Sequence, residues 1–262
     1  MLKMVDDTQL YQELLTFCKE IREKQKYKFD GNLEFDEFHK QCYYEMYLKN
    51  RGSDIPPKPM TFKEKIPKLK EVYAKASIFY ATKRNEMIKG FDIQFGHWFE
   101  KAFGDFLLSK GIQTVKKGFP FPDIAVIKGE EPVAYFELKY IRAPFIYANK
   151  FVGENRWDYE CSLTLDVGEK LTKQREKIES ELLSNNVPVF YVWWYDAPHI
   201  KGIFFMNAEE IFLYWDSKGT SHNRKEREGD LESKQEKGKI YPPLLKMRGL
   251  SEFLTILTKA TK

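Results

Sequence analysis

Two short apolar runs, at residues 121–127 and 134–139, constrain the fold of this chain more than any other feature of its sequence. Each run has the length and composition of a β-strand, and the polar, glycine-containing segment between them has the composition of a turn. Asp123 stands at the start of the first run. Side chains two apart on a strand leave by the same face, so Glu137 and Lys139 of the second run point together. The runs therefore predict adjacent strands that bring Asp123, Glu137 and Lys139 within reach of a single point.

This combination of two carboxylates and a lysine is suited to metal-dependent cleavage of a phosphodiester bond. Hard divalent cations such as Mg²⁺ bind oxygen ligands, and a positioned lysine can activate or orient a water molecule. The alternative for Asp123 is a turn residue that follows Pro122 and caps a strand. The alternative for Glu137 and Lys139 is an ion pair on an exposed strand face. The order of the three residues, after a helix that carries a further glutamate, favours the catalytic interpretation.

That helix is predicted over residues 93–108, before the two strands. Its apolar side chains recur at helical spacing, and Gly111 follows as a helix stop. The apolar positions are Phe95, Trp98, Phe99, Ala102, Phe103, Phe106 and Leu107. Glu100 is a rare carboxylate along this apolar face. It could be a solvated helix glutamate that pairs with Lys101 or Lys110.

These motifs resemble those of the PD-(D/E)xK nuclease superfamily, which has the restriction-endonuclease-like fold. Pro122-Asp123 and Glu137-Leu138-Lys139 supply the motif itself. On the preceding helix, Gly96, Phe99 and Glu100 match a Gly-x-x-Phe-Glu pattern that many members of the superfamily carry.

The resemblance implies a fold, a cofactor and a set of site residues. The implied fold is α/β, with a restriction-endonuclease-like core in which helices flank a central mixed β-sheet. The implied cofactor is Mg²⁺, for which Mn²⁺ can substitute. Lys139 would orient the attacking water or offset charge on the phosphate. The implied catalytic residues are Asp123, Glu137 and Lys139, and the implied metal ligands are Glu100, Asp123, Glu137 and the backbone carbonyl of Leu138.

A long segment without a predicted element, residues 142–165, follows the second motif. Segments of this length are usually functional or disordered. Basic and aromatic side chains are interleaved in this one, beside the predicted metal site, and such side chains contact phosphates and bases. The residues that we expect to contact DNA here are Arg142, Lys150, Asn155, Arg156, Trp157 and Tyr159.

A helix is predicted from Asp166, because Asp166 and Glu169 have the spacing of a capping box. Lys173 and Gln174 on this helix are also expected to contact DNA. In the RecB-like branch of the superfamily, a Gln on this helix lies near the site and is followed four residues later by Tyr. Gln174 matches the first position but Ile178 stands at the second, so the branch stays open. Gln174 could equally be a surface residue of the helix.

The following segments predict further parts of the core. Residues 187–195 and 200–206 are apolar, β-branched and aromatic, which is typical of buried strands. Asn207 and Glu210 then have the spacing of a capping box for a short helix. The charged residues 216–240 predict either a mobile loop or hairpin tip, or a flap that orders on DNA.

The sequence divides into two regions near residue 90. Residues 1–90 are predicted to be mostly helical, with helices over 8–24 and 36–49. This N-terminal extension would contact DNA or form a dimer interface, or would present a plain solvated helical surface. Residues 91–262 would form the nuclease core with C-terminal additions, ending in a helix from Ser251.

The composition of the chain mainly indicates where in the cell the protein is expected to be located. The 262 residues include 43 basic and 39 acidic side chains, a net charge of +4, which is compatible with a local DNA-binding surface. No run approaches the roughly 20 apolar residues that span a membrane, and the first residues lack the pattern of a secretory signal. The three cysteines are widely spaced and indicate neither a zinc site nor a disulfide framework, so a cytoplasmic location is expected.

Together these features predict a Mg²⁺-dependent, sequence-specific endonuclease that hydrolyses phosphodiester bonds of double-stranded DNA, as type II restriction enzymes do. The chain lacks a P-loop signature and hence a helicase motor. A palindromic target would require a homodimer, and a cognate DNA methyltransferase would be its functional partner. The alternatives are a DNA repair, structure-specific or RecB-like nuclease, and a non-cleaving nucleic-acid-binding protein on the same fold.

Overall fold

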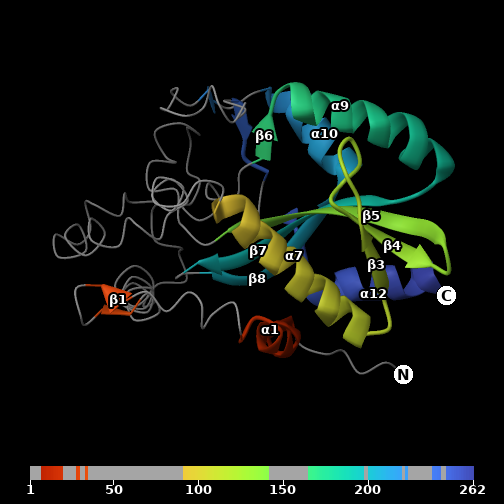
Figure 1. Cartoon of the computed structure of the whole chain (residues 1–262). Coiled ribbons are helices and arrows are strands. Elements are labelled where there is room, and N and C mark those ends of the chain that lie inside the picture. The colour runs from red at the N-terminus through yellow and green to blue at the C-terminus, as the bar shows by residue number, and fades with distance from the viewer. Residues whose placement is uncertain are drawn as a thin grey trace.

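The computed structural model describes residues 7–19, 28–29, 33–34, 91–141, 165–197, 200–219, 222–223, 238–242 and 246–262. Within these residues, six strands form a mixed central sheet with helices on both of its faces (Figure 1). The expected α/β class with a central mixed sheet flanked by helices is therefore confirmed.

The central sheet has the strand order β11-β8-β7-β5-β4-β3. Its strands are β3 (Gln113–Lys116), β4 (Ile124–Lys128), β5 (Glu131–Ile141), β7 (Val189–Ala197), β8 (Ile200–Asn207) and β11 (Arg248–Gly249). Neighbouring strands are antiparallel, except that β5 and β7 run parallel. A parallel pair needs a long crossover connection, and the chain between β5 and β7 includes a helix.

The helices enclose one apolar cluster on each face of the sheet (Figure 1). The first face is covered by α1 (Asp7–Thr16), α7 (Phe91–Ser109) and α12 (Leu250–Thr261). The second face is covered by α9 (Glu169–Lys177), by η4 (Ile178–Leu182), which continues α9, and by α10 (Ala208–Lys218). A short 3₁₀ turn, η5 (Leu183–Asn185), leads from η4 towards β7. Strand alternation divides the side chains of β5: Phe136 and Leu138 lie in the first cluster and Tyr135 in the second.

Local sequence signals account for several element boundaries. Gly111, with φ of 78°, follows the end of α7, and Gly129, with φ of 63°, makes the turn between β4 and β5. Asn207 and Glu210 form the capping box at the start of α10. These three boundaries lie where the sequence predicts them.

The start of α9 differs from the sequence prediction. Asp166 lies in strand β6 (Leu165–Val167), and α9 begins at Glu169 with Gly168 at the N-cap and no side-chain cap. The Asp166 backbone is extended because β6 pairs with β10 (Gly238–Ile240), and its carboxylate accepts a hydrogen bond from Lys239. The predicted capping box of Asp166 and Glu169 is therefore wrong.

Strand β10 also pairs with β9 (His222–Asn223), so β6, β10 and β9 form a small second sheet. Strands β9 and β10 of this sheet belong to the charged segment 216–240. Residues 224–237, where the loop and flap alternatives differ, lie outside the described residues.

Helix α1 shares a core with the elements that follow residue 90. The Tyr11 hydroxyl donates a hydrogen bond to the backbone carbonyl of Tyr195 at 3.0 Å and accepts one from Trp194 Nε1 at 3.2 Å. Leu14 is fully buried in the first apolar cluster, and Lys110 pairs with Glu13 at 2.6 Å. The first predicted helix thus packs against α7, α12 and the central sheet.

Other parts of the N-terminal region are described only in pieces. A hairpin of β1 (Lys28–Phe29) and β2 (Leu33–Glu34) is present, whereas the helix predicted over 36–49 lies outside the described residues. No helix in the described part of the chain is long and apolar enough to cross a membrane.

Candidate active site

The β4–β5 hairpin brings the motif residues together. Ile124 is paired with Phe136 across the two antiparallel strands, so Asp123 lies beside Glu137. The backbone N–H of Asp123 donates a hydrogen bond to Glu137 Oε2 at 3.2 Å. Glu137 and Lys139 leave β5 on the face that α9 covers, opposite the face of Leu138.

Glu137 is a buried carboxylate with both oxygens bound. The residue as a whole is 3% exposed. Oε1 accepts a hydrogen bond from Lys139 Nζ at 2.6 Å, and Oε2 accepts one from Gln174 Nε2 at 3.1 Å as well as that of the Asp123 backbone. Burial by itself would raise the pKa of Glu137, but the charges of Lys139 and Lys170 and the hydrogen bonds lower it to about 2. Glu137 is therefore ionised and held in one orientation.

Asp123 is in the opposite electrostatic situation. Burial, and then the negative charge of Glu137, raise the pKa of Asp123 to about 7, against the lowering effect of Lys139. The charge of Glu100 raises it further. Near neutral pH, Asp123 is thus divided between its protonated and ionised forms, and a bound divalent cation would remove the repulsion between the two carboxylates.

Lys139 carries its positive charge into this site. Burial would lower the pKa of Lys139, but Glu137 and Asp123 outweigh burial and raise it above its ordinary value. The side chain as a whole is about one-third exposed. A lysine that stays protonated is suited to orienting a water or offsetting charge on a phosphate, and not to accepting a proton.

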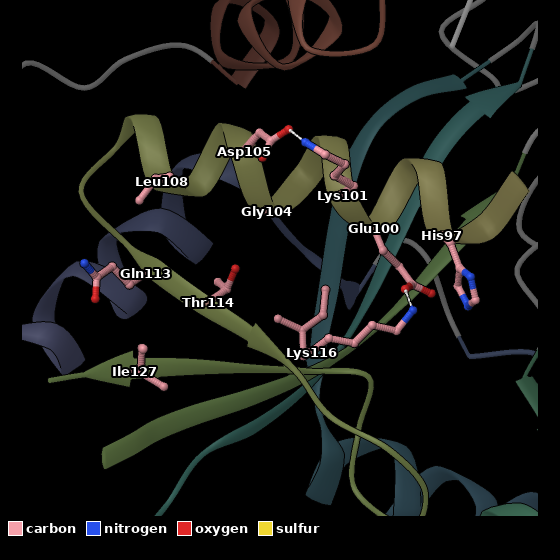
Figure 2. A pocket seen from close by; sticks show the side chains of 11 residues that line it. His97, Glu100, Lys101, Gly104, Asp105, Leu108, Gln113, Thr114, Lys116 and Ile127 are labelled. Atoms are coloured by element: carbon pink, nitrogen blue, oxygen red, sulfur yellow. Dashed lines mark hydrogen bonds and ion pairs between the residues drawn. The ribbon is translucent and has the colours of Figure 1, made fainter. Parts of the chain in front are cut away.

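Glu100 approaches the site from α7. Its carboxylate pairs with Lys116 Nζ of β3 at 2.7 Å (Figure 2). The two predicted alternative partners pair elsewhere, Lys101 with Asp105 and Lys110 with Glu13. The charge of Glu100 reaches Asp123, but in the described residues no group of three or more His, Cys, Asp or Glu side chains is arranged to hold a metal ion. A metal-site role for Glu100 stays a prediction.

Glu100 also lines a groove between α7 and the strands β3 and β4 (Figure 2). The groove has a volume of about 480 Å³, with Ile124 and Ile127 among its apolar lining residues. Gly104 permits the close approach of α7 to β3, because a Cβ there would lie 3.3 Å from Thr114 Oγ1. The groove lies on the α7 side of the sheet, whereas Glu137 and Lys139 face α9.

Gln174 of α9 is part of the site interior. Its side chain is 3% exposed, its Nε2 donates to Glu137, and its Oε1 accepts a hydrogen bond from the Tyr191 hydroxyl at 3.0 Å. Because Gln174 is buried, the alternative of a surface position is wrong. Both ends of its amide are occupied within the protein, and a DNA contact of Gln174 stays a prediction.

Sequence reasoning missed Tyr191. The residue lies in the run that predicts a buried strand, and nothing local to that run indicates an active-site role. The parallel register of β5 and β7 places Tyr191 beside Glu137 and Trp193 beside Lys139. The buried Trp193 indole N–H has no hydrogen-bond partner within the described ranges, and an unsatisfied donor beside a site is typical of a place for water or ligand.

Among the other residues predicted to contact DNA, Lys173 is exposed on α9, and it donates a hydrogen bond to Glu169 one turn earlier. Six predicted contacts lie outside the described residues: Arg142, Lys150, Asn155, Arg156, Trp157 and Tyr159.

Comparison of the chain with protein family models, with curated proteins and with solved structures finds no match.

Proposed function

We propose that this protein is a Mg²⁺-dependent endonuclease that hydrolyses phosphodiester bonds of double-stranded DNA, on a restriction-endonuclease-like core. The observation that carries the proposal is the convergence of Asp123, Glu137 and Lys139 on the α9 face of one β-hairpin. Within it, burial and the neighbouring carboxylate raise the pKa of Asp123 to about 7. A carboxyl group whose pKa is raised by burial and a charged neighbour is a common feature of functional sites.

The donor set fits Mg²⁺. It consists of hard carboxylate oxygens, and Mg²⁺ is usually held by one or two carboxylates together with waters and substrate phosphates. Asp123 and Glu137 would hold the ion with the Leu138 carbonyl, and Glu100 would support a second ion or its waters. When bound, Mg²⁺ polarises a phosphate oxygen and makes water more acidic.

Side chains of the protein itself position the water, the phosphate and the metal ligands. Lys139 orients the attacking water or offsets the negative charge that grows on the phosphate, since a positioned ammonium stabilises developing charge in a water-poor site. Glu137 keeps Lys139 in place through the 2.6 Å ion pair. Asp123 must be ionised to serve as a ligand.

Within nucleases, we favour a sequence-specific type II restriction enzyme that acts in the cytoplasm. The chain has no P-loop signature, and it has a large amount of sequence outside the motifs that could read a target. A palindromic target would call for a homodimer, and a cognate methyltransferase would protect host DNA.

One observation favours a second candidate. Gln174 donates directly to the site carboxylate, at the position where RecB-like nucleases carry a Gln. A RecB-like repair or structure-specific nuclease would use the same three motif residues on DNA ends, branches or single strands.

The test is digestion of unmethylated plasmid and phage DNA with Mg²⁺, beside an Asp123→Asn variant that keeps the size of the side chain. Discrete fragments from the wild type and none from the variant would support a restriction enzyme. A metal-dependent smear, or cutting confined to single-stranded or branched DNA, would support the RecB-like or repair alternative. No cutting of any of these substrates would overturn the nuclease proposal and leave a non-cleaving binding protein.

A further inference from the structure

We infer that Tyr191 is a positioning residue of this site: its hydroxyl fixes the amide of Gln174, and Gln174 in turn fixes the Glu137 carboxylate for a divalent cation. The inference rests on the proposed function and deepens it, because it assigns a role to a strand β7 residue outside the three motifs.

Three buried polar side chains from three different elements form the chain of contacts. Tyr191 of β7 is 1% exposed, and Gln174 of α9 and Glu137 of β5 are each 3% exposed. The Tyr191 hydroxyl lies 3.0 Å from Gln174 Oε1, and Gln174 Nε2 lies 3.1 Å from Glu137 Oε2. The parallel register places Tyr191 directly beside Glu137 in the sheet, so the amide bridges two neighbouring strands from above.

Hydrogen-bond chemistry selects one orientation of the Gln174 amide. With Nε2 towards Glu137, the amide donates to a carboxylate that accepts only, and Oε1 is left to accept from Tyr191. A flipped amide would set its oxygen against Glu137, which places two acceptors together in a buried site. If the Tyr191 hydroxyl is removed, Oε1 becomes a buried acceptor that has lost its donor, and the amide is drawn towards other partners.

The consequence falls on the Glu137 carboxylate. Lys139 holds one oxygen, whereas Gln174 and the Asp123 backbone hold the other. Three donors from two sides prevent rotation of the carboxylate plane. Partners that orient a metal ligand typically change metal affinity by about 10–100-fold when mutated, so loss of the Tyr191 hydroxyl should weaken cation binding by about tenfold.

The test measures Mn²⁺ affinity by titration calorimetry on four variants of the full chain. Tyr191→Phe removes the contact of the hydroxyl with Gln174, Gln174→Met removes both contacts of the amide, and the double variant combines the two changes. Tyr195→Phe is the matched control, since Tyr195 is a buried tyrosine four residues further along the same strand and in the same apolar cluster. We expect about tenfold weaker binding for Tyr191→Phe, at least as much for Gln174→Met, and less than a twofold change for Tyr195→Phe.

The double variant separates positioning from general packing. If Tyr191 acts through Gln174, Tyr191→Phe has no further effect in the Gln174→Met background. Equal weakening by Tyr191→Phe in both backgrounds, or no weakening in either, would overturn the inference.

A second readout is independent of metal and of cutting: solvent exchange of the ¹⁵N-labelled Gln174 side-chain amide, followed by NMR. The wild-type amide should exchange slowly, and Tyr191→Phe should speed exchange by at least tenfold. Fast exchange in the wild type, or unchanged exchange in Tyr191→Phe, contradicts the inference, and the wild-type spectrum decides the matter if that variant does not fold. If the wild type binds Mn²⁺ but cuts no DNA, only the nuclease proposal is contradicted. If the wild type cuts DNA and the Tyr191→Phe variant has unchanged Mn²⁺ affinity, only the positioning role is contradicted.

Discussion

The Lys139 ammonium lies 2.6 Å from Oε1 of Glu137, the residue two positions before it on the same face of β5. This contact joins the charge that the proposed chemistry needs to the carboxylate that would bind the cation. It also means that each of the two side chains stabilises the charged form of the other.

Replacement of Lys139 by Met should therefore affect both stability and activity. Glu137 would remain buried without its cation, which we expect to cost about 1–3 kcal/mol of unfolding free energy. The rate of DNA cleavage should fall by about 100-fold or more, as for loss of a group that stabilises transition-state charge. Lys139→Arg is the control that keeps the charge: urea unfolding should be near wild type. An equal loss of stability in both variants would show that packing of the lysine, and not its charge, is what matters.

Asp123→Asn should stabilise the metal-free protein above pH 7 while it abolishes cleavage. The folded-state pKa of Asp123 is about 7, against 3.8 for an ordinary aspartate, so the folded protein binds the extra proton between these values. The contribution of protonated Asp123 to the free energy of unfolding is fully present below about pH 4, and it is lost as the pH rises to about 7. Asparagine carries no charge to lose, so the variant should be more stable by about 1–3 kcal/mol at pH 8 in EDTA. Thermal unfolding from pH 4 to 8 measures this, and a destabilised variant at pH 8 would contradict it.

Cation affinity should depend on pH in the same range. Below about pH 7, a proton competes with the cation for Asp123, so Mn²⁺ affinity should fall by about tenfold per pH unit between pH 7 and pH 5. Glu137 adds nothing to this slope, because its pKa is about 2. Titration calorimetry at several pH values checks the slope. A flat profile would indicate that Asp123 is not a ligand.

The role of Glu100 can be determined by comparing a variant of Glu100 with a variant of its ion-pair partner, Lys116. If Glu100 supports a cation, Glu100→Gln should raise the half-saturating Mg²⁺ concentration for cleavage by about tenfold or more, whereas Lys116→Gln should leave it nearly unchanged. If Glu100 only pairs with Lys116, which lies 2.7 Å away, the two variants should behave alike. Half-saturation measured on one plasmid substrate distinguishes these cases.

Tyr11→Phe tests whether α1 is part of the same folding unit as the central sheet. The hydroxyl accepts from Trp194 Nε1 and donates to the Tyr195 carbonyl, so its removal should destabilise the protein by about 1–2 kcal/mol. The loss should appear in a single cooperative urea transition followed by far-UV circular dichroism. A separate early transition that carries the whole effect would show that α1 unfolds independently.

The sequence by itself determined the parts that depend on neighbouring residues. Apolar spacing and Gly111 predict α7 and its end, and two short apolar runs joined by a glycine-containing turn predict the β4–β5 hairpin. Antiparallel strands joined by a short turn must pair, so the meeting of Asp123 with Glu137 and Lys139 followed from local pattern alone.

Only the tertiary structure decided which distant residues complete the site. The parallel alignment of β5 with β7 places Tyr191 beside Glu137, the packing of α9 buries Gln174 against both, and the approach of α7 to β3 pairs Glu100 with Lys116. Parallel register and helix placement are set by how whole faces pack over long sequence separations, which no local spacing of residues encodes. The same reason explains why Asp166 joined a strand and not a helix cap: its pairing partner, β10, lies about 70 residues further along the chain.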